Sequence, residues 1–312
     1  MALSKISNDM FTTISRPRAG PIIYNGDMQV SQRATSTTGV GNGDNGYPTI
    51  DRWRFSENGS ISAEWTHSQA TDVPTGEGFT KSLKMDCTTA DGSPGSGDAV
   101  YVQQRFEGQD LQGLKKGTSN AETLTLAFWV KSTKTGTFIC ELIDVDNSRH
   151  ISKSYTVSSS DTWEKKIVTF AGDTTGAFGN DNGESLNVIW YLVAGTNLTE
   201  GTLATSWAAY NDANGAVGQV NIADSTSNDW LLTGVQLEVG EFNSSTLPPF
   251  QHESYGDNLQ RCQRYYNIFG NATGKPIGMA AFYSASAAYV GPLVYPVEMR
   301  SSPTISITGG SG

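Results

Sequence analysis

The stretch TLTLAFWVKSTKTGTFICELID, Thr123–Asp144, shows the alternation of a β-strand in two successive runs. In the first run every second residue is large and apolar: Leu124, Leu126, Phe128 and Val130. Because successive side chains of a strand point to opposite faces, this run predicts a strand with one buried face. After the polar break Thr133–Gly136 the pattern resumes with Phe138, Cys140 and Leu142, so we interpret the two runs as a hairpin. A sheet with one apolar face needs a second sheet to cover it, which predicts a β-sandwich.

The rest of the 312-residue chain carries similar short apolar runs. They lie at Ile22–Val30, Thr49–Phe55, Ser60–Gln69, Lys81–Thr88, Ala99–Phe106, Ser154–Val157, Thr162–Phe170, Leu186–Val193, Val217–Ile222 and Trp230–Val239. Asn58-Gly59 predicts a hairpin turn between two of them, and Thr35–Gly46 predicts a glycine-rich loop. With 34 glycines, 17% charged residues and no long helix between the runs, the chain is predicted to be all-β, an antiparallel jelly-roll β-sandwich.

The pattern changes after Pro248-Pro249. In Asp257–Gly270 the apolar residues recur at helical spacing, and Asp257 and Gly270 suit the two ends of a helix. The stripe consists of Leu259, Cys262, Tyr266 and Phe269. Met279–Val297 and Pro303–Thr308 then return to strand-like patterns. We therefore expect an arm at residues 1–21, the sandwich at residues 22–248, and one α-helix with a small C-terminal β region at residues 249–312. The arm is too short to fold alone, so it either orders on a partner or is a disordered tail.

The charge and the apolar content of the chain exclude two classes of partner. The net charge is −10 and no basic stripe is present, so we expect neither nucleic acid nor an anionic membrane surface as a partner. No stretch reaches the roughly 18 consecutive apolar residues of a membrane span. The widely spaced Cys87, Cys140 and Cys262 form no CxxC pair, which predicts buried reduced thiols rather than disulfides or metal ligands. These features predict a protein that is made and kept under cytosol-like conditions, or one that leaves the cell by a route other than secretion.

Three stretches of the sequence carry a family resemblance, and the third has features that no general β-sandwich requires. The first is IIYNGDMQV with TIDRWRF, the second is LTLAFWVKS followed by DTWEKKIVTFAGDTTG, and the third is LTGVQLEVGEFNSSTLPPFQHESYGDNLQRCQRYY. In this order they resemble a family of bacteriophage structural proteins, tail-fibre-like or otherwise virion-associated, with a jelly roll similar to that of carbohydrate-binding modules. The resemblance spans Ile22 to Tyr266. It implies a virion protein assembled in the host cytoplasm, attached to other virion proteins by its N-terminal arm and forming a homotrimer.

Many carbohydrate-binding modules hold a structural calcium ion with an aspartate pair just before their final strand. This chain has Leu232–Val235, LTGV, at that place, so the resemblance does not carry the calcium ion over. A carboxylate could come from Asp27 or Glu238. The turn Asp144–Asn147 has oxygen ligands but lacks the rest of an EF-hand loop, and we interpret it as an ordinary polar turn. We therefore predict no metal ligands and no cofactor, with a structural calcium ion as the open alternative.

The sequence contains no catalytic constellation. Its histidines form no HxH or HExxH pattern, and no GxSxG elbow is present. The histidines are His67, His150 and His252. Glycan hydrolysis needs only two carboxylates, but acidic residues in sandwich loops are more often turn formers. The conceivable carboxylates are Asp144, Asp146, Asp161 and Glu164. The chain is predicted not to be an enzyme.

The segment TSWAAYNDAN, Thr205–Asn214, places aromatic residues in a polar stretch between strands. Sugar rings have apolar C–H faces that stack on aromatic rings, while Asp and Asn side chains bind the hydroxyls. We predict a carbohydrate-binding site made of Trp207, Tyr210, Asn211 and Asp212, with a host surface glycan as its ligand. This hypothesis expects Trp207→Ala to abolish binding without unfolding the domain. The alternative is that Trp207 folds under its own loop.

The expected helix carries Arg261, Arg264 and Tyr265, residue types that are enriched at protein interfaces. They predict either a contact with a neighbouring subunit or a lock between the helix and its own sandwich. We favour the lock. Deletion of the helix should then unfold the domain, whereas deletion of a subunit contact should only dissociate an oligomer.

Taken together, these features predict a non-enzymatic virion protein, a tail-fibre or adhesion component that contacts the host cell surface. One alternative is a capsid decoration or head-fibre protein, in which the jelly roll is only a folded module. Another is a tailspike polysaccharide depolymerase. Exposed loops with aromatic residues favour adhesion, and loops without them favour decoration.

Overall fold

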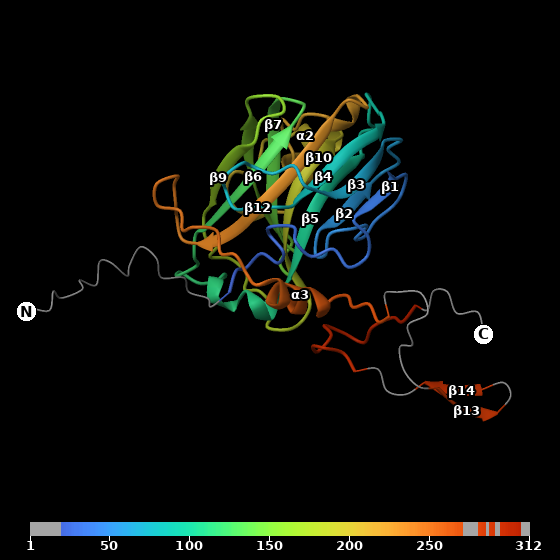
Figure 1. The fold of residues 1–312 in the computed structure, drawn as a ribbon. Coiled ribbons are helices and arrows are strands. Elements are labelled where there is room, and N and C mark those ends of the chain that lie inside the picture. Colours follow the sequence, from blue (N-terminus) through green and yellow to red (C-terminus); the bar gives the residue numbers. More distant parts are fainter. Residues whose placement is uncertain (1–19, 271–279, 285–286, 291–293, 307–312) are drawn as a thin grey trace, which may run out of the picture.

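The chain forms a sandwich of two six-stranded antiparallel sheets (Figure 1), which confirms the predicted all-β fold. The computed structural model describes residues 20–270, 280–284, 287–290 and 294–306. The first sheet contains, in spatial order, β1 (Ser36–Gly41), β3 (Glu64–Ala70), β4 (Ser82–Thr89), β12 (Asp229–Val239), β6 (Leu124–Ser132) and β9 (Glu164–Phe170). The second sheet contains β11 (Ala208–Ala209), β8 (Arg149–Val157), β7 (Gly136–Asp144), β10 (Glu184–Ala194), β5 (Ala99–Glu107) and β2 (Arg54–Asn58).

The core lies between the two sheets and is rich in aromatic side chains. Trp190 of β10 contacts Phe128 of β6 edge to face, with ring centroids 5.8 Å apart, and Trp53 at 5.4 Å. Tyr155 of β8 packs on both Phe128 and Phe138. Cys87, Cys140 and Cys262 are buried and unpaired, as predicted. Alternate residues of each strand therefore face this core, and the others form the outer faces of the sheets.

The predicted hairpin in Thr123–Asp144 is wrong, because its two runs belong to different sheets. β6 pairs with β9 and β12, whereas β7 pairs with β8 and β10. The apolar side chains of β6 and β7 enter the same core from opposite sheets. Their sequence pattern is therefore the same as that of two strands paired in a hairpin. The Asn58-Gly59 hairpin is wrong for the same reason, since β2 pairs with β5 and β3 pairs with β1 and β4.

Three predicted elements between strands also differ from the structure. Ile22–Val30 is buried but is not a strand, because Asn25 (φ 52°) and Met28 (φ 60°) turn the backbone. The Asn25 side chain closes this turn by bonding the backbone of Val30 at both its N–H and its C=O. Val217–Ile222 is a turn that leads into the 3₁₀ turn η4 (Ile222–Asp224), whereas part of the expected glycine-rich loop forms β1.

The helix α3 (Tyr255–Gln263) begins and ends earlier than predicted. Ser254 caps it, because its hydroxyl accepts a hydrogen bond from the Asp257 N–H, and Asp257 lies inside the first turn. The helix lies at one end of the sandwich in Figure 1. Beyond it, β13 (Ala280–Ser284) and β14 (Ala287–Val290) pair only with each other within the described ranges. Residues 303–306 form no strand, and residues 307–308 lie outside the described chain, as do residues 1–19 of the expected arm.

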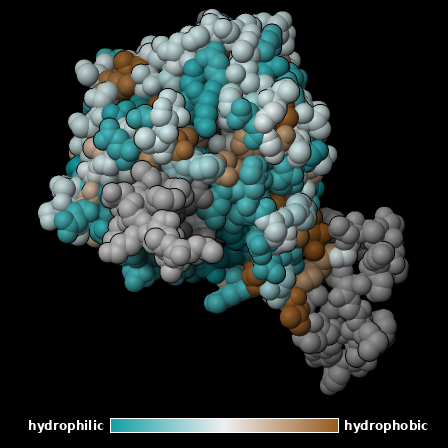
Figure 2. Space-filling model, turned by 60° about the vertical axis from the view of Figure 1, so that its left-hand side comes forward, coloured by the Kyte–Doolittle hydropathy of each residue, from teal (hydrophilic) through white to brown (hydrophobic). Residues whose placement is uncertain are grey.

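The surface shown in Figure 2 is mostly hydrophilic, with hydrophobic residues scattered singly or in small groups. No helix among the described residues is long and apolar enough to span a membrane. The expected division at residues 21 and 248 is not tested by these observations and stays a prediction.

Candidate functional site

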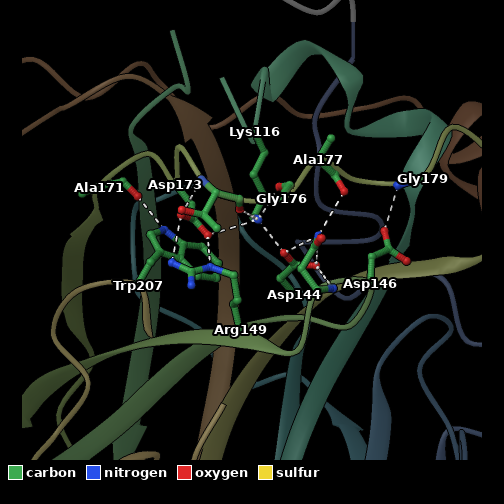
Figure 3. Close-up of polar contacts among 12 residues, drawn as sticks. Lys116, Asp144, Asp146, Arg149, Ala171, Asp173, Gly176, Ala177, Gly179 and Trp207 are labelled. Atoms are coloured by element: carbon green, nitrogen blue, oxygen red, sulfur yellow. Dashed lines mark hydrogen bonds and ion pairs between the residues drawn. The ribbon is translucent and has the colours of Figure 1, made fainter. Parts of the chain in front are cut away.

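Trp207, the first residue of the predicted glycan site, is held by the body of the sandwich (Figure 3). Its indole N–H donates a hydrogen bond of 2.7 Å to the Ala171 carbonyl oxygen. The ring is partly buried against the main core, and Lys116 Nζ lies 5.4 Å from the ring centroid. These contacts are those of a residue that folds under its own loop.

Lys116 joins Trp207 to a group of buried charges. Its ammonium group forms ion pairs with Asp144 and with Asp173, the latter at 3.1 Å, and donates to the carbonyl oxygens of Thr175 and Gly176 at 2.8 Å. Lys116, Asp144 and Asp173 are 7%, 0% and 5% exposed. Arg149 binds both oxygens of Asp173, at 2.7 and 3.1 Å. Two cations and two carboxylates therefore form a compensated cluster, which we call the Lys116 cluster.

The turn that follows Asp144 is closed by its own side chains. Asn147 donates to Asp144 Oδ2 at 2.9 Å and to the Ala177 carbonyl oxygen at 3.0 Å, and Asp146 accepts from the Gly179 N–H at 2.8 Å. Glu164, another conceivable catalytic carboxylate, accepts two backbone N–H groups and Lys166. Each of these carboxylates stabilises its own turn, which is the ordinary interpretation of acidic loop residues.

Replacing Trp207 by alanine should therefore lower the free energy of unfolding by about 3 kcal/mol, because the packing of the ring and one hydrogen bond are both lost. Trp207→Phe keeps most of the packing and should cost about 1 kcal/mol. Urea unfolding of the two variants measures the difference. A Trp207→Ala protein as stable as wild type would show that the indole only rests on the surface.

Tyr210 stays accessible, in contrast to Trp207. Its ring is 42% exposed and lies 5.1 Å from the ring of His150. Its hydroxyl donates to Asp212 Oδ1 at 2.6 Å, and its backbone N–H binds the Ser148 carbonyl oxygen. Asn211 and Asp212 are exposed beside it, and the Asn211 side chain caps the 3₁₀ turn η3 (Asp212–Asn214). The structure thus brings three of the four predicted glycan residues together and separates Trp207 from them.

Tyr210 lies over the outer face of the second sheet, where the fully buried Glu141 organises a polar network. Glu141 Oε1 is 2.7 Å from His150 Nδ1, and Oε2 accepts a 2.7 Å hydrogen bond from the Tyr191 hydroxyl. Burial, followed by the negative charge of Glu141, raises the pKa of Tyr191 well above its ordinary value, so the hydroxyl stays a donor. Gly215 closes over this network: a Cβ there would lie 3.3 Å from Glu141 Oε1. The network therefore supports the Tyr210 loop from below.

The other half of this outer face carries side chains of β5 and β10. The strand register pairs Tyr101 with Tyr191 and Arg105 with Asn187. Tyr101 is part-exposed, and its ring lies 5.6 Å from that of Tyr191. Sequence reasoning did not identify these residues. The sequence pattern that could have identified Tyr101 and Arg105 lies in Ala99–Glu107. There, aromatic and polar side chains occupy every second position between the core residues.

The helix residues expected at an interface all make contacts within their own chain. Arg261 binds Glu253 at 2.5 Å and the Pro21 carbonyl oxygen at 2.8 Å. Arg264 donates two hydrogen bonds to Glu107, at 2.9 and 2.7 Å, and the Tyr265 hydroxyl donates a third at 2.5 Å. These are the contacts of a helix locked to its own sandwich, and a subunit contact through the same residues stays a prediction.

A cleft of about 780 Å³ lies beside α3. Its walls mix charges of both signs and include Tyr24, Asp110, Asn182, Arg261, Arg264 and Arg300. Arg300 lies across this cleft. Its guanidinium group donates a hydrogen bond to the Asn182 carbonyl oxygen, and its backbone N–H donates one to the Arg264 carbonyl oxygen. The arginines of α3 are thus engaged in this cleft by groups of the same chain.

The carboxylates considered for calcium, Asp27 and Glu238, line a cavity of only about 10 Å³ together with Glu253. Burial raises the pKa of Asp27, which accepts a hydrogen bond from Asn258 at 3.4 Å. Glu253 is ion-paired with Arg261. Within the described ranges, no three acidic, histidine or cysteine side chains are close enough together to hold a metal ion. These residues do not form a calcium ligand set, and a calcium requirement is a matter for the binding assay below.

No protein-family model matches the sequence, and no curated protein is significantly similar to it. Solved structures with a similar fold include the enzymatically active domain of tailspike protein 4 of bacteriophage CBA120, at 15% identity and a TM-score of 0.35 over 65% of this chain and 21% of that one. A family 11 carbohydrate-binding module of a Clostridium thermocellum cellulosomal cellulase matches at 11% identity and a TM-score of 0.31, over 66% of this chain and 98% of the module.

A cyclase from Fischerella sp. TAU is also similar, at 11% identity and a TM-score of 0.36, over 72% of this chain and 100% of the cyclase. The chain spans about a fifth of the tailspike chain, 21%. At such low identities and TM-scores the likeness concerns the fold and does not indicate what the chain binds.

Proposed function

We propose that this protein is a bacteriophage virion component of the tail-fibre or adhesion type, which binds a host surface glycan on the outer face of its second sheet. The observation that carries the binding function is the exposed Tyr210 ring with Asn211 and Asp212 beside it, on the face that also holds Tyr101. The virion role rests on the resemblance of the three quoted stretches to phage structural proteins.

The composition of this face suits a saccharide. Exposed tyrosine rings offer stacking surfaces for the C–H faces of sugars, and neighbouring carboxamide, carboxylate and guanidinium groups bind hydroxyls. The strands from β2 to β8 are five neighbours in the sheet, and four spacings of about 4.8 Å give a width of about 19 Å. Tyr101 and the Tyr210 loop lie on opposite sides of the buried Glu141 network, and each of them can pack on a sugar residue.

We also propose how the protein assembles. Residues 1–21 attach the protein to other virion proteins, the chain assembles as a homotrimer, and the particle is built in the host cytoplasm. The family resemblance supports these three statements. Analytical ultracentrifugation of the full chain measures the oligomeric state, and a monomer at micromolar concentration would contradict the trimer.

The binding function predicts that Tyr210→Ala weakens binding to host envelope polysaccharide at least tenfold, since stacking and the ordered Asp212 are both lost. The assay uses labelled protein and purified envelope polysaccharide of candidate hosts, with and without calcium. Tyr255→Ala is the matched control, because Tyr255 is 60% exposed but lies on α3. Equal losses in both variants, or none in Tyr210→Ala, would contradict the proposed face.

The same assay separates the alternatives. Saturable binding without release of reducing ends supports the adhesion component. Release of reducing ends from the polysaccharide would establish a depolymerase instead. A protein that binds none of its authentic host surfaces would support a capsid decoration or head-fibre role, with the sandwich as a folded module only.

A further inference from the structure

Two arginines lie next to each other on the outer face of the second sheet. The register pairs Arg54 of β2 with Gln103 of β5, and Arg105 follows two residues later on the same face. Diagonal neighbours of this kind are about 7–8 Å apart. Burial lowers the pKa of Arg54, and the positive charge of Arg105 lowers it further. The fold therefore holds two like charges close enough to repel each other.

Only one carboxylate forms an ion pair with these two cations. Arg105 Nη1 is 2.8 Å from Glu184 Oε2, and both side chains are about one-third exposed, 34% and 31%. Arg54 Nη1 contacts the neutral side chains of Asn45, at 3.2 Å, and Ser56. Arg54 forms no ion pair with any described residue. The pair thus has an uncompensated positive charge in a chain whose net charge is −10.

Unused hydrogen-bonding groups lie beside this charge. Asn187 is opposite Arg105 in the register and is only 7% exposed, yet its Oδ1 atom has no partner. The Arg105 Nε atom is buried and equally without a partner. Buried polar groups nearly always have hydrogen-bond partners in folded proteins. The two groups lie at the base of this corner of the sheet, where no described residue pairs with the Arg54 charge. The corner therefore suits a polar, anionic ligand that binds from outside to the exposed parts of the two guanidinium groups.

Several guanidinium donors of this corner make no hydrogen bond to the described residues. Arg54 Nε and Nη2 make no hydrogen bond to the described part of the chain, and neither does Arg105 Nη2. Guanidinium groups bind carboxylates through two parallel hydrogen bonds, which neutral hydroxyl groups cannot match. Tyr101, part-exposed and two residues before Gln103, adds an aromatic surface at the same corner.

We propose that Arg54, Tyr101, Arg105 and Asn187 bind a sugar residue that bears a carboxylate, so that the glycan recognised by this protein is an acidic polysaccharide. This inference rests on the proposed function and names the class of its ligand. The sugar carboxylate pairs with the two guanidinium groups, a ring hydroxyl binds the Asn187 carboxamide, and the C–H face of the sugar packs on Tyr101. Repulsion between the arginines is relieved when the ligand is bound.

Oligogalacturonate and its carboxyl-reduced neutral form test this inference by isothermal titration calorimetry. Wild-type protein should bind the acidic form at least about tenfold more tightly, and Arg54→Gln should remove that preference. Raising the salt concentration should weaken binding of the acidic form only. Lys165→Gln, on the exposed face of β9 in the other sheet, removes the same charge elsewhere and should have no effect.

Three results would overturn the inference. They are equal affinity for the two forms, an Arg54→Gln protein that binds the acidic form as wild type does, and no binding of either form. None of these results disproves glycan binding as such. That function is tested separately, by the binding of wild type and Tyr210→Ala to host envelope polysaccharide. Suppose that Tyr210→Ala loses binding to host polysaccharide, and that wild type binds oligogalacturonate and its neutral form equally. The proposed function would then stand, and the proposal of an acidic ligand would be wrong.

Discussion

Lys116→Met should lower the free energy of unfolding by about 3–5 kcal/mol at neutral pH, the cost of removing one partner from a buried ion pair. Methionine keeps the volume of the side chain but not its charge. Asp144, which is fully buried, then keeps only its hydrogen bonds to Asn147, and Asp173 keeps Arg149. The carbonyl oxygens of Thr175 and Gly176 lose their donor as well. Urea unfolding followed by far-UV circular dichroism measures the loss.

The pH dependence of this loss follows from Asp173. Burial alone would raise the pKa of its carboxyl, but the hydrogen bonds from Arg149, the Thr175 N–H and Lys116 outweigh burial and lower it below the ordinary 3.8. A depressed folded-state pKa gives stability that is present above pH 3.8 and is lost as the pH falls through the lower folded-state value. The difference in free energy of unfolding between wild type and Lys116→Met should therefore become smaller below pH 3.8.

Lys115→Met provides the matched control. Lys115 is the preceding residue, its side chain is 54% exposed, and its one ion pair is with Glu122 on the surface. Its loss should cost no more than about 0.5 kcal/mol. If the two variants have the same stability, the Lys116 cluster contributes nothing beyond an ordinary surface pair.

The alternation of apolar residues predicted burial correctly and strand pairing incorrectly. Phe128 and Phe138 both lie in the core, as the pattern requires. Alternation specifies which face of a strand is buried, but not which strand it pairs with. A short polar break can close a hairpin or lead from one sheet to the other, and Thr133–Gly136 does the second. Pairing depends on strands that are distant in the sequence.

Ile22–Val30 shows the same limit for backbone conformation. Its apolar residues are buried, as a strand's would be, but Asn25 and Met28 adopt positive φ angles. Asparagine tolerates this region because its side chain bonds the nearby backbone. Nothing in the local pattern distinguishes Asn25 in such a turn from asparagine at the end of a strand.

The candidate site was only partly predictable because its residues come from distant strands. Tyr210, Asn211 and Asp212 are consecutive, and a polar loop with an aromatic residue was enough to identify them. Arg54, Arg105 and Asn187 meet only because β2, β5 and β10 are neighbours in the sheet. Trp207 has the same local setting as Tyr210, and only the contacts with Lys116 and Ala171 show that it serves the fold.

Glu107→Gln should release α3 from the sandwich and lower the free energy of unfolding by about 2–4 kcal/mol. Glu107 is 2% exposed and accepts two hydrogen bonds from Arg264, one from Tyr265 and one from Gln109. Glutamine leaves the Arg264 charge without its carboxylate. The expected cost is below that of a fully buried pair, because a quarter of the Arg264 side chain, 25%, is in contact with solvent. Hydrogen exchange of the α3 amides should accelerate before that of β5.

Acid should have the same effect on the wild-type protein. Burial raises the pKa of Glu107, but the hydrogen bonds from Arg264 and Tyr265 outweigh burial and lower it below the ordinary 4.5. The stabilisation is therefore fully present above pH 4.5 and is lost as the pH falls through the lower folded-state value. In the Glu107→Gln protein, the loss of stability that follows protonation of Glu107 should be missing. A titration curve of stability that is unchanged by the substitution would contradict the assignment.

Glu298→Gln is the control for the helix contact. Glu298 lines the cleft beside α3, but its side chain is exposed and only its carbonyl oxygen binds Arg264. It should leave stability unchanged. The same pair of variants separates the two interpretations of α3. If the helix locks its own sandwich, Glu107→Gln lowers stability equally at all protein concentrations. If Arg264 and Tyr265 instead join subunits, the loss depends on concentration and the oligomer dissociates before the domain unfolds.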